Sequence, residues 1–218
     1  FSLACLPKED YPIIDQDTLG VKIKINSNIL FKLIDKTKFA ISNEETRYFL
    51  NGLYFNISSE SNKNMVTLVG TDGHRLAKFS YEVEENIDQI SGVIIPKKTI
   101  YEISKLLSEN NTEVEIYISS NKIVFILQNI IFISKLIDGS FPDYKRVIPN
   151  DNNNVLKINR DILLSAVDRV STIANEKSPV IKFKLLQNIL NLNTINNENS
   201  TATEDVNVSY DGEELEIG

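Results

Sequence analysis

Thr71-Asp72-Gly73-His74-Arg75-Leu76 lies between two apolar stretches of the chain. The run before it, Val66 to Val69, predicts a buried strand, and the stretch Leu76 to Tyr81 after it has apolar residues at alternate positions, which predicts a second strand. An Asp-Gly pair between two such stretches is typical of a β-hairpin, because glycine adopts the positive φ that the turn requires. We therefore expect a hairpin whose turn is centred on Asp72-Gly73.

The turn is followed by His74, the chain's sole histidine, and by Arg75. A hairpin turn by itself requires neither residue. One interpretation is a hairpin corner with incidental polar side chains. The other is a surface pocket in which Thr71, Gly73 and Leu76 form the floor and His74 and Arg75 form the rim.

Composition limits the classes of protein that the chain can belong to. The chain has 218 residues, of which 42% are hydrophobic, enough for one large domain or two smaller ones. Cys5 is the single cysteine, so we expect no intrachain disulfide and no metal site built on cysteines. The sequence has no glycine-rich phosphate loop such as GxxxxGK followed by Ser or Thr, and we expect no cofactor. The net charge of −7 argues against nucleic-acid binding unless basic residues gather on one surface.

The pattern of strands and helices repeats along the chain. A strand, a helix and three strands occur twice between about residues 20 and 138, and the unit begins a third time. Asn159–Asp168 lies over Asn26–Asp35 at a shift of 133 (159 − 26). Asp151–Asn154 is a polar junction and the expected last domain boundary. The pattern predicts an α+β fold built from repeated β-α-β-β-β units.

Apolar periodicity gives the expected limits of each element. The expected helices cover Ile29–Ile34, the residues from a cap at Thr99 to Leu107, and Arg160–Ile173. The expected strands are Val21–Ile25, Phe49–Ile57, Met65–Thr71, Leu76–Val83, Val93–Ile95, Val114–Ile118, Ile123–Leu127, Ile131–Ile137, Val180–Leu185, Ile189–Ile195, Val206–Tyr210 and Glu214–Ile217. Pro7–Asp17, with two prolines and several acidic residues, is expected to be a linker.

The stretch Val-Gly-Thr-Asp-Gly-His-Arg-Leu-Ala at residues 69–77 resembles the signature of the bacterial DNA polymerase III beta subunit, the sliding clamp. Three further stretches support the resemblance in the family's order: Arg47–Gly52, Val93–Lys98 and Lys135–Pro149. The resemblance implies a DNA-clamp fold with antiparallel sheets outside and helices lining a central hole. It also implies three parts: residues 1–19 as the tail of a first domain and linker, 20–150 as a complete second domain, and 151–218 as the first half of a third.

The resemblance further implies what the protein does. A clamp is a non-catalytic subunit of DNA-directed DNA polymerase, a nucleotidyltransferase, and acts in the cytoplasm as its processivity factor. Two full-length subunits form a homodimeric ring around double-stranded DNA. The ring docks the polymerase alpha subunit, the clamp loader, other polymerases and repair proteins through short peptide motifs. Most of the first domain and the end of the third are expected to lie outside this chain.

Two sets of site residues follow from the resemblance and from residue type. A hydrophobic pocket for partner peptides, between the second and third domains, is expected to include Phe49, Leu50, Thr71, Gly73, His74, Arg75, Leu76, Pro142, Arg146 and Val147. Phe49 stands where the family often has Tyr. The candidate DNA contacts are Lys32, Lys36, Lys38, Arg47, Tyr48, Lys97, Lys98 and Arg169, since basic and aromatic side chains suit phosphate, sugar and base.

Two other functions remain open from the residues alone. One is a β-rich repeat module that binds proteins and has no DNA role. The other is a hydrolase that uses Asp72 and His74 as an acid/base pair. These two residues flank a turn glycine, so we expect their side chains to diverge, which disfavours the hydrolase.

Overall fold

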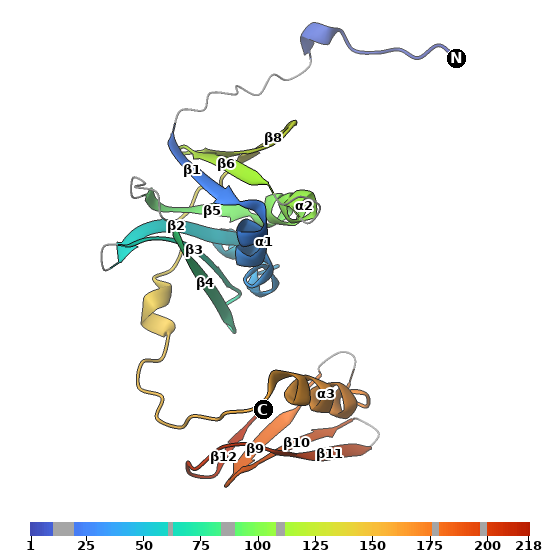
Figure 1. Cartoon of the computed structure of the whole chain (residues 1–218). Coiled ribbons are helices and arrows are strands. Elements are labelled where there is room, and N and C mark those ends of the chain that lie inside the picture. Colours follow the sequence, from blue (N-terminus) through green and yellow to red (C-terminus); the bar gives the residue numbers. More distant parts are fainter. Residues whose placement is uncertain (11–19, 61–62, 84–89, 108–111, 176–178, 197–199) are drawn as a thin grey trace. The chain divides into compact units, whose positions relative to one another are not determined.

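The computed structural model describes residues 1–10, 20–60, 63–83, 90–107, 112–175, 179–196 and 200–218 (Figure 1). The chain divides into two units, unit 1 from Phe1 to Pro142 and unit 2 from Asp143 to Gly218, and each is described by itself. Within the described ranges, no helix has the length and apolar character needed to cross a membrane. Residues 11–17 of the expected linker lie outside the described residues.

Unit 1 contains two antiparallel sheets of four strands each. Its strands are β1 Val21–Asn26, β2 Gly52–Glu60, β3 Lys63–Thr71, β4 Leu76–Val83, β5 Ile90–Pro96, β6 Glu113–Ile118, β7 Lys122–Leu127 and β8 Ile130–Lys135. The strand orders are β4-β3-β2-β5 and β1-β6-β7-β8. The two repeats therefore exchange their first strands: β1 pairs with β6 of the second repeat, and β5 pairs with β2 of the first.

Two helices cover the core of unit 1. Helix α1 spans Ser27–Asp35 and helix α2 spans Lys97–Leu107, and Figure 1 shows them side by side against the sheets. Their apolar faces, including Leu33 and Ile103, are buried in the same cluster as strand residues of both sheets, such as Phe55 and Ile116. Short 3-10 turns lie at η1 Lys8–Asp10, η2 Lys38–Ala40 and η3 Tyr48–Leu50.

Unit 2 repeats the first half of unit 1. It contains η4 Tyr144–Val147, α3 Arg160–Ser171, β9 Lys182–Leu186, β10 Ile189–Ile195, β11 Thr201–Asn207 and β12 Leu215–Ile217. Its sheet has the order β11-β10-β9-β12, which matches β4-β3-β2-β5 strand for strand. The core of unit 2 is centred on Val170, Leu190 and Leu192.

The predicted repeat of the helix starts is confirmed at the caps. The side-chain oxygen of Asn26 accepts a hydrogen bond from the backbone N–H of Asn28 at 2.9 Å, and that of Asn159 accepts one from Asp161 at 2.9 Å. A side-chain oxygen at this position satisfies an N–H group that has no partner within the helix. The two asparagines that the shift of 133 superposes therefore have the same role.

Several predicted boundaries were wrong. Phe49–Ile57 is not one strand, because Tyr48–Leu50 forms a 3-10 turn and β2 begins at Gly52. Helix α2 begins at Lys97 rather than after a cap at Thr99, whose hydroxyl instead lies 2.6 Å from that of Ser134.

The ends of two strands also differ from the prediction. Strand β8 ends at Lys135, and Ile137 forms an isolated bridge with Ile94. Strand β11 covers Thr201–Asn207, so the predicted strand Val206–Tyr210 lies several residues too far along the chain. The cross-strand bonds of polar residues such as Asn193 with Thr203 stabilise this segment, and alternation of apolar residues does not reveal them. The division between the units at Pro142–Asp143 precedes the polar junction Asp151–Asn154, and the domain assignment stays a prediction.

Candidate functional site

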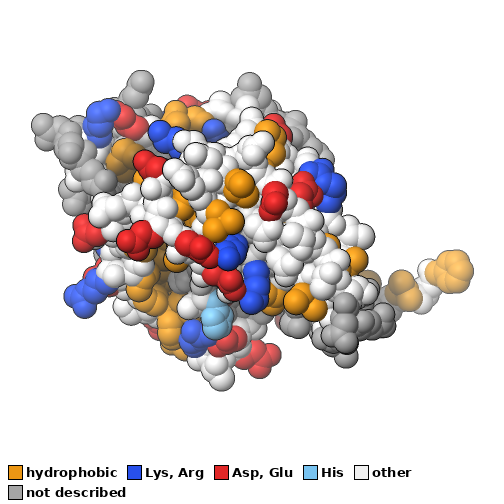
Figure 2. Space-filling model, turned by 90° about the horizontal axis from the view of Figure 1, so that it is seen from below, with side chains coloured by type: hydrophobic (Ala, Val, Ile, Leu, Met, Phe, Trp, Pro, Cys, Tyr) orange, Lys and Arg blue, Asp and Glu red, His pale blue; other side chains and the backbone are white. Residues whose placement is uncertain are grey.

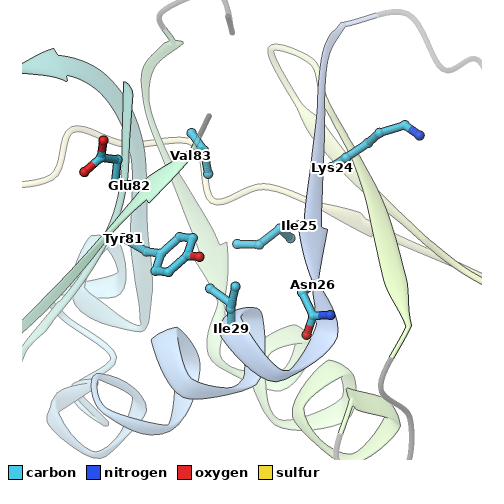
Figure 3. Close-up of a pocket in the computed structure, with 7 residues that line it drawn as sticks. All are labelled: Lys24, Ile25, Asn26, Ile29, Tyr81, Glu82 and Val83. Atoms are coloured by element: carbon cyan, nitrogen blue, oxygen red, sulfur yellow. The ribbon is translucent and has the colours of Figure 1, made fainter. Parts of the chain in front are cut away.

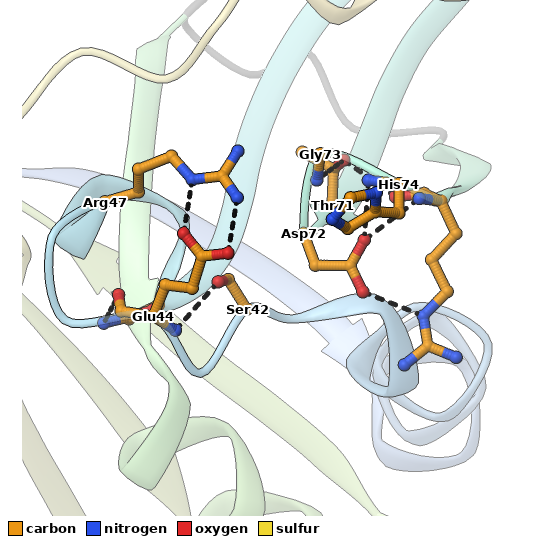
Figure 4. Close-up of polar contacts among 9 residues, drawn as sticks. Ser42, Glu44, Arg47, Thr71, Asp72, Gly73 and His74 are labelled. Atoms are coloured by element: carbon orange, nitrogen blue, oxygen red, sulfur yellow. Dashed lines mark hydrogen bonds and ion pairs between the residues drawn. The ribbon is translucent and has the colours of Figure 1, made fainter. Parts of the chain in front are cut away.

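The predicted hairpin is confirmed, and side chains of its turn close it. Strands β3 and β4 pair up to Thr71 and Leu76. The Thr71 hydroxyl donates to the backbone carbonyl of Arg75 at 2.8 Å and accepts from the backbone N–H of Gly73 at 3.1 Å (Figure 4). Since both contacts lie within the turn, Thr71 stabilises a specific backbone conformation there.

Asp72 is the central acceptor of the turn. Its carboxylate accepts the backbone N–H groups of His74 and Arg75 at 3.0 Å each and the Nε of Arg75 at 3.0 Å. Partial burial acts to raise the pKa of Asp72, but these backbone and side-chain bonds outweigh it and hold the pKa below its ordinary value. The carboxylate thus bonds to the turn backbone and to the side chain of Arg75. His74 contacts it through the backbone N–H and not through the imidazole.

Gly73 permits close contact between the turn and the loop that follows η2. Its φ is +88°, a conformation that favours glycine. A Cβ at this position would lie 2.5 Å from Nη1 of Arg47. Arg47 is in turn held by Glu44: its Nε and Nη2 each donate to a carboxylate oxygen at 2.7 Å (Figure 4). This bidentate bond raises the pKa of Arg47 and lowers the pKa of Glu44.

His74, Arg75 and Phe39 are exposed beside the turn. Figure 2 shows the imidazole of His74 at the surface, in pale blue. The guanidinium carbon of Arg75 lies 5.8 Å from the centre of the Phe39 ring, a cation–π distance. We call the turn 71–76, together with Arg47 and Phe39, the turn surface. It combines exposed apolar groups with hydrogen-bond donors, which suits a peptide better than a small ion.

The remaining predicted pocket residues of unit 1 lie on η3 and on the segment that leaves β8. Phe49 contacts Tyr48 edge to face, with ring centres 5.9 Å apart, and the Cβ position of Gly139 lies 3.2 Å from the Phe49 Cβ. Leu50 is only 3% exposed and so supports the surface from below. Pro142 is exposed and follows Phe141, whose ring stacks on Tyr54 at 4.9 Å.

Arg146 and Val147 belong to unit 2 and are described within it. Arg146 donates from Nε to Asp143 at 2.9 Å, and Val147 is 68% exposed. Their contribution to a peptide site stays a prediction.

The predicted DNA contacts on α1 and just after it differ in whether their ammonium groups have a partner. Lys38, just after α1, lies 3.1 Å from Asp35 and donates to the Ser104 hydroxyl of α2 at 3.3 Å. Lys32 is exposed, with its ammonium 5.8 Å from the centre of the Phe79 ring. Lys36 is exposed, and within the described residues its ammonium has no carboxylate partner.

Helix α2 and unit 2 hold the other candidates. Lys97 donates to the side-chain oxygen of Asn43, and Lys98 beside it is exposed. The hydrogen bond from Lys38 joins η2, which follows α1, to Ser104 of α2, and α1 and α2 lie side by side (Figure 1). Arg169 on α3 is bound by Glu204 of β11 through two bonds of 2.5 and 2.9 Å, which raise its pKa.

A separate cavity of about 510 Å³ lies between β1, the start of α1 and the end of β4 (Figure 3). Ile25, Ile29 and Tyr81 form its apolar walls. Lys24 and Glu82 also line it, but the first is paired with Glu113 and the second with Lys63. Among the described residues, the two charged side chains that line the cavity are thus already paired, and neither is left to fix the orientation of a ligand.

Sequence reasoning missed Glu44 and Phe39, and it did not assign the hydrogen bonds that the Asp72 carboxylate accepts. Glu44 and Arg47 lie in an irregular loop, where no periodicity indicates which side chains meet. Phe39 contacts the turn from a different element. The sequence predicted Asp72 as a turn residue and offered it as one half of an acid/base pair, but did not identify it as the acceptor of backbone N–H groups that an aspartate before a turn glycine often is.

Comparisons with known proteins identify the same family over almost the whole chain. The profile of the DNA polymerase III beta subunit, central domain, matches residues 24–143, and that of its C-terminal domain matches residues 145–218. A curated protein named Beta sliding clamp from Caulobacter vibrioides is 44% identical over 218 residues, covering 100% of this chain and 59% of that protein. The Beta sliding clamp of Haemophilus influenzae is 38% identical over the same length and 58% covered.

Solved structures give the same result. A sliding clamp from Bartonella birtlesii bound to griselimycin superposes with a TM-score of 0.90 at 43% identity, over 100% of this chain and 58% of that one. The DNA polymerase III subunit beta from Pseudomonas aeruginosa superposes with a TM-score of 0.90 at 35% identity, over 100% and 59%. The chain therefore spans 58–59% of the length of these relatives.

Proposed function

The chain belongs to the DNA polymerase III beta subunit family, and from this premise we propose that it acts in a sliding clamp, the processivity factor of a bacterial replicative DNA polymerase. The observation on which the proposal chiefly rests is the pairing of α1 and α2. Lys32 of α1, Lys36 at the C-cap of α1 and Lys98 of α2 are exposed. Positive charge on adjacent helices suits a phosphate backbone and requires no base contact.

The energetics of phosphate contact explain why a ring is useful. A protein that holds duplex DNA through phosphates alone binds with Kd of about 10⁻⁴ to 10⁻⁶ M at physiological salt. Such contacts are weak enough to permit sliding, but the protein soon dissociates. Closure of a ring around the duplex prevents dissociation without strengthening any single contact. We propose that this chain contributes to such a ring as part of a homodimer of the full-length protein.

We propose that the turn surface docks partner peptides, including segments of the polymerase alpha subunit, the clamp loader, other polymerases and repair proteins. Leu76 and Phe49 offer apolar contact, and Gly73 permits close approach of a peptide backbone. The guanidinium Nη groups of Arg75 and the imidazole of His74 can bind peptide carbonyls or amide side chains. The proposed site keeps Pro142, Arg146 and Val147 as expected members. The proposed location of the protein is the cytoplasm.

The DNA role is tested by titrating a duplex of about 30 base pairs with the protein at about 50 mM and about 200 mM salt. Affinity should fall steeply with salt. Failure to associate even at the lower salt would favour a protein-binding module with no DNA role.

The docking role is tested with a peptide from the polymerase tail. Leu76→Asp should weaken binding at least tenfold, because it places a charge on the apolar floor, and Arg146→Ala should weaken it less. Circular dichroism should show that both variants stay folded. Titration curves identical to those of the unmodified protein would rule out this surface.

A further inference from the structure

We propose that charged side chains on the strands determine which strand each exchanged strand can join, so that exchange stays within one unit of one chain. The exchanged strands are β1, β5 and β12, and the strands that receive them are β6, β2 and β9. Strand β12 occupies in unit 2 the place that β5 occupies in unit 1. The inference concerns recognition between strands and does not depend on the proposed DNA or peptide role.

The pairing of β1 with β6 is positive on the exchanged strand and negative on the receiving one. Lys24 lies opposite Glu115 in the register, with a nitrogen–oxygen distance of 3.6 Å. Two diagonal contacts are shorter, at 2.8 Å each, from Lys22 to Glu115 and from Lys24 to Glu113. Hydrogen bonds to these glutamates raise the pKa of both lysines, and the bond from Lys22 lowers the pKa of Glu115. Both partners are therefore charged at neutral pH.

The pairing of β12 with β9 has the same geometry with the signs reversed. Glu216 lies opposite Lys184 in the register. The two diagonal contacts join Lys184 to Glu214, just before β12, at 2.6 Å, and Lys182 to Glu216 at 3.1 Å. The hydrogen bond to Glu214 raises the pKa of Lys184. Here the exchanged strand is negative and the receiving strand is positive.

The third pairing, of β5 with β2, carries no charge. The paired stretches, residues 90–96 and 52–57, contain no Asp, Glu, Lys or Arg. The three exchanged strands are thus positive, neutral and negative, and each receiving strand has the matching character.

The apolar pattern cannot make this distinction, because aliphatic residues alternate with the charged ones in β1 and β12 alike. The charges can. Strand β1 on β9 would place lysines opposite lysines, and β12 on β6 would place glutamates opposite glutamates, and like charges directly opposite each other destabilise a strand pair. Packing of α1 and α2 over one core favours the native arrangement, and the charges act against particular wrong partners, in the same chain or in a second copy.

The side chains of the four diagonal ion pairs are 29–59% exposed, so each contact adds little to the stability of the native pairing. What discriminates is the change from attraction to repulsion. Each cross-strand contact shifts an equilibrium by about two- to fivefold, and the contacts of one strand pair together by about tenfold or more.

The experiment uses the whole chain and begins with stability. One variant reverses β1 (Lys22→Glu with Lys24→Glu), a second reverses β6 (Glu113→Lys with Glu115→Lys), and a third combines all four changes. Each reversal alone should lower the melting temperature of unit 1 by about 2 to 6 °C, measured by differential scanning calorimetry. The combination restores opposite charges and should regain the melting temperature.

Refolding then separates strand selection from stability. In the combined variant β1 is negative and β6 is positive, so β1 also matches β9, and β12 also matches β6. The fraction of chains that return to the native species after dilution from guanidinium, measured by size-exclusion chromatography, should fall by about twofold or more although the stability is restored. Inverting unit 2 as well makes the patterns distinct again and should restore the yield; its changes are Lys182→Glu, Lys184→Glu, Glu214→Lys and Glu216→Lys.

Glu102→Lys with Lys105→Glu is the matched control. It inverts an exposed ion pair of 3.0 Å within α2, on which no strand pairing depends, and should leave the refolding yield unchanged. The inference is overturned if the combined variant refolds as well as the unmodified protein, or if the control lowers the yield equally. A combined variant that fails to regain the melting temperature would also overturn it, because the contacts would then not act through their charges.

Discussion

Replacement of Gly73 by alanine should destabilise unit 1 because of the backbone conformation of the turn. The φ of Gly73 is +88°, and an L-residue in the left-handed region costs about 1–2 kcal/mol. The new Cβ would also lie 2.5 Å from Nη1 of Arg47. That contact adds a smaller cost, because a guanidinium at the end of a flexible side chain can move aside.

A loss of this size should lower the melting temperature of unit 1 by about 3 to 6 °C. Differential scanning calorimetry of the whole chain is the suitable assay, since separate units can unfold in separate transitions. Leu190→Ala, in the core of unit 2, identifies the other transition because it removes a fully buried side chain. Gly73→Ala should then lower the melting temperature of the unit 1 transition, which Leu190→Ala leaves unchanged. It should not change the melting temperature of the unit 2 transition.

Two further variants separate the backbone cost from the steric one. In an Arg47→Ala background the clash is absent, so Gly73→Ala should cost less there than in the unmodified protein. Gly139→Ala is the matched control: a Cβ there would lie 3.2 Å from the Cβ of Phe49, without the positive φ, and should shift the transition less. An unchanged melting temperature for Gly73→Ala would refute the reasoning about φ.

Other substitutions test the electrostatics. Asp72 has a folded-state pKa below its ordinary value of 3.8, so the stability it contributes is present above that value and is lost as the pH falls through the folded-state pKa. The melting temperature of Asp72→Asn should therefore lie furthest below that of the unmodified protein near neutral pH, and the gap should narrow on acidification; a constant gap would contradict this assignment. Lys36→Ala should reduce the slope of log K against log salt for duplex binding by about 1, as expected for one phosphate contact. Arg169→Ala should reduce the slope by less, because Glu204 already neutralises that guanidinium, and equal reductions would show that the pair opens on DNA.

Local chemistry explains why the hairpin and the matching starts of α1 and α3 could be predicted. The turn at Asp72-Gly73 and the caps at Asn26 and Asn159 each depend on contacts within a few residues of the chain. Such contacts are determined by residue type and spacing, so they can be predicted from the sequence alone. The strand β4 was predicted with its observed limits, Leu76–Val83, because apolar residues alternate with polar ones from Ala77 to Val83 beside a well-defined turn.

The candidate site was only partly predictable. The members of the turn were found because they are contiguous, and the resemblance supplied residues from distant segments. The pairing of Glu44 with Arg47, and the placement of Phe39 against Arg75, were not found. Both arise where irregular segments fold back on the turn, and irregular backbone has no period from which neighbouring side chains can be inferred.

The sequence by itself determined the repeated strand-helix-strand units, the hairpin and the matching starts of α1 and α3, because these depend on periodicity and short-range hydrogen bonds. Only the tertiary structure decided which strands pair: β1 joins β6 and β5 joins β2, so that each repeat completes the sheet of the other. Backbone N–H and C=O groups are the same in every strand, and alternation specifies which face is buried but not which neighbour completes the ladder. The partner is selected when α1 and α2 pack against both sheets and bury one shared core.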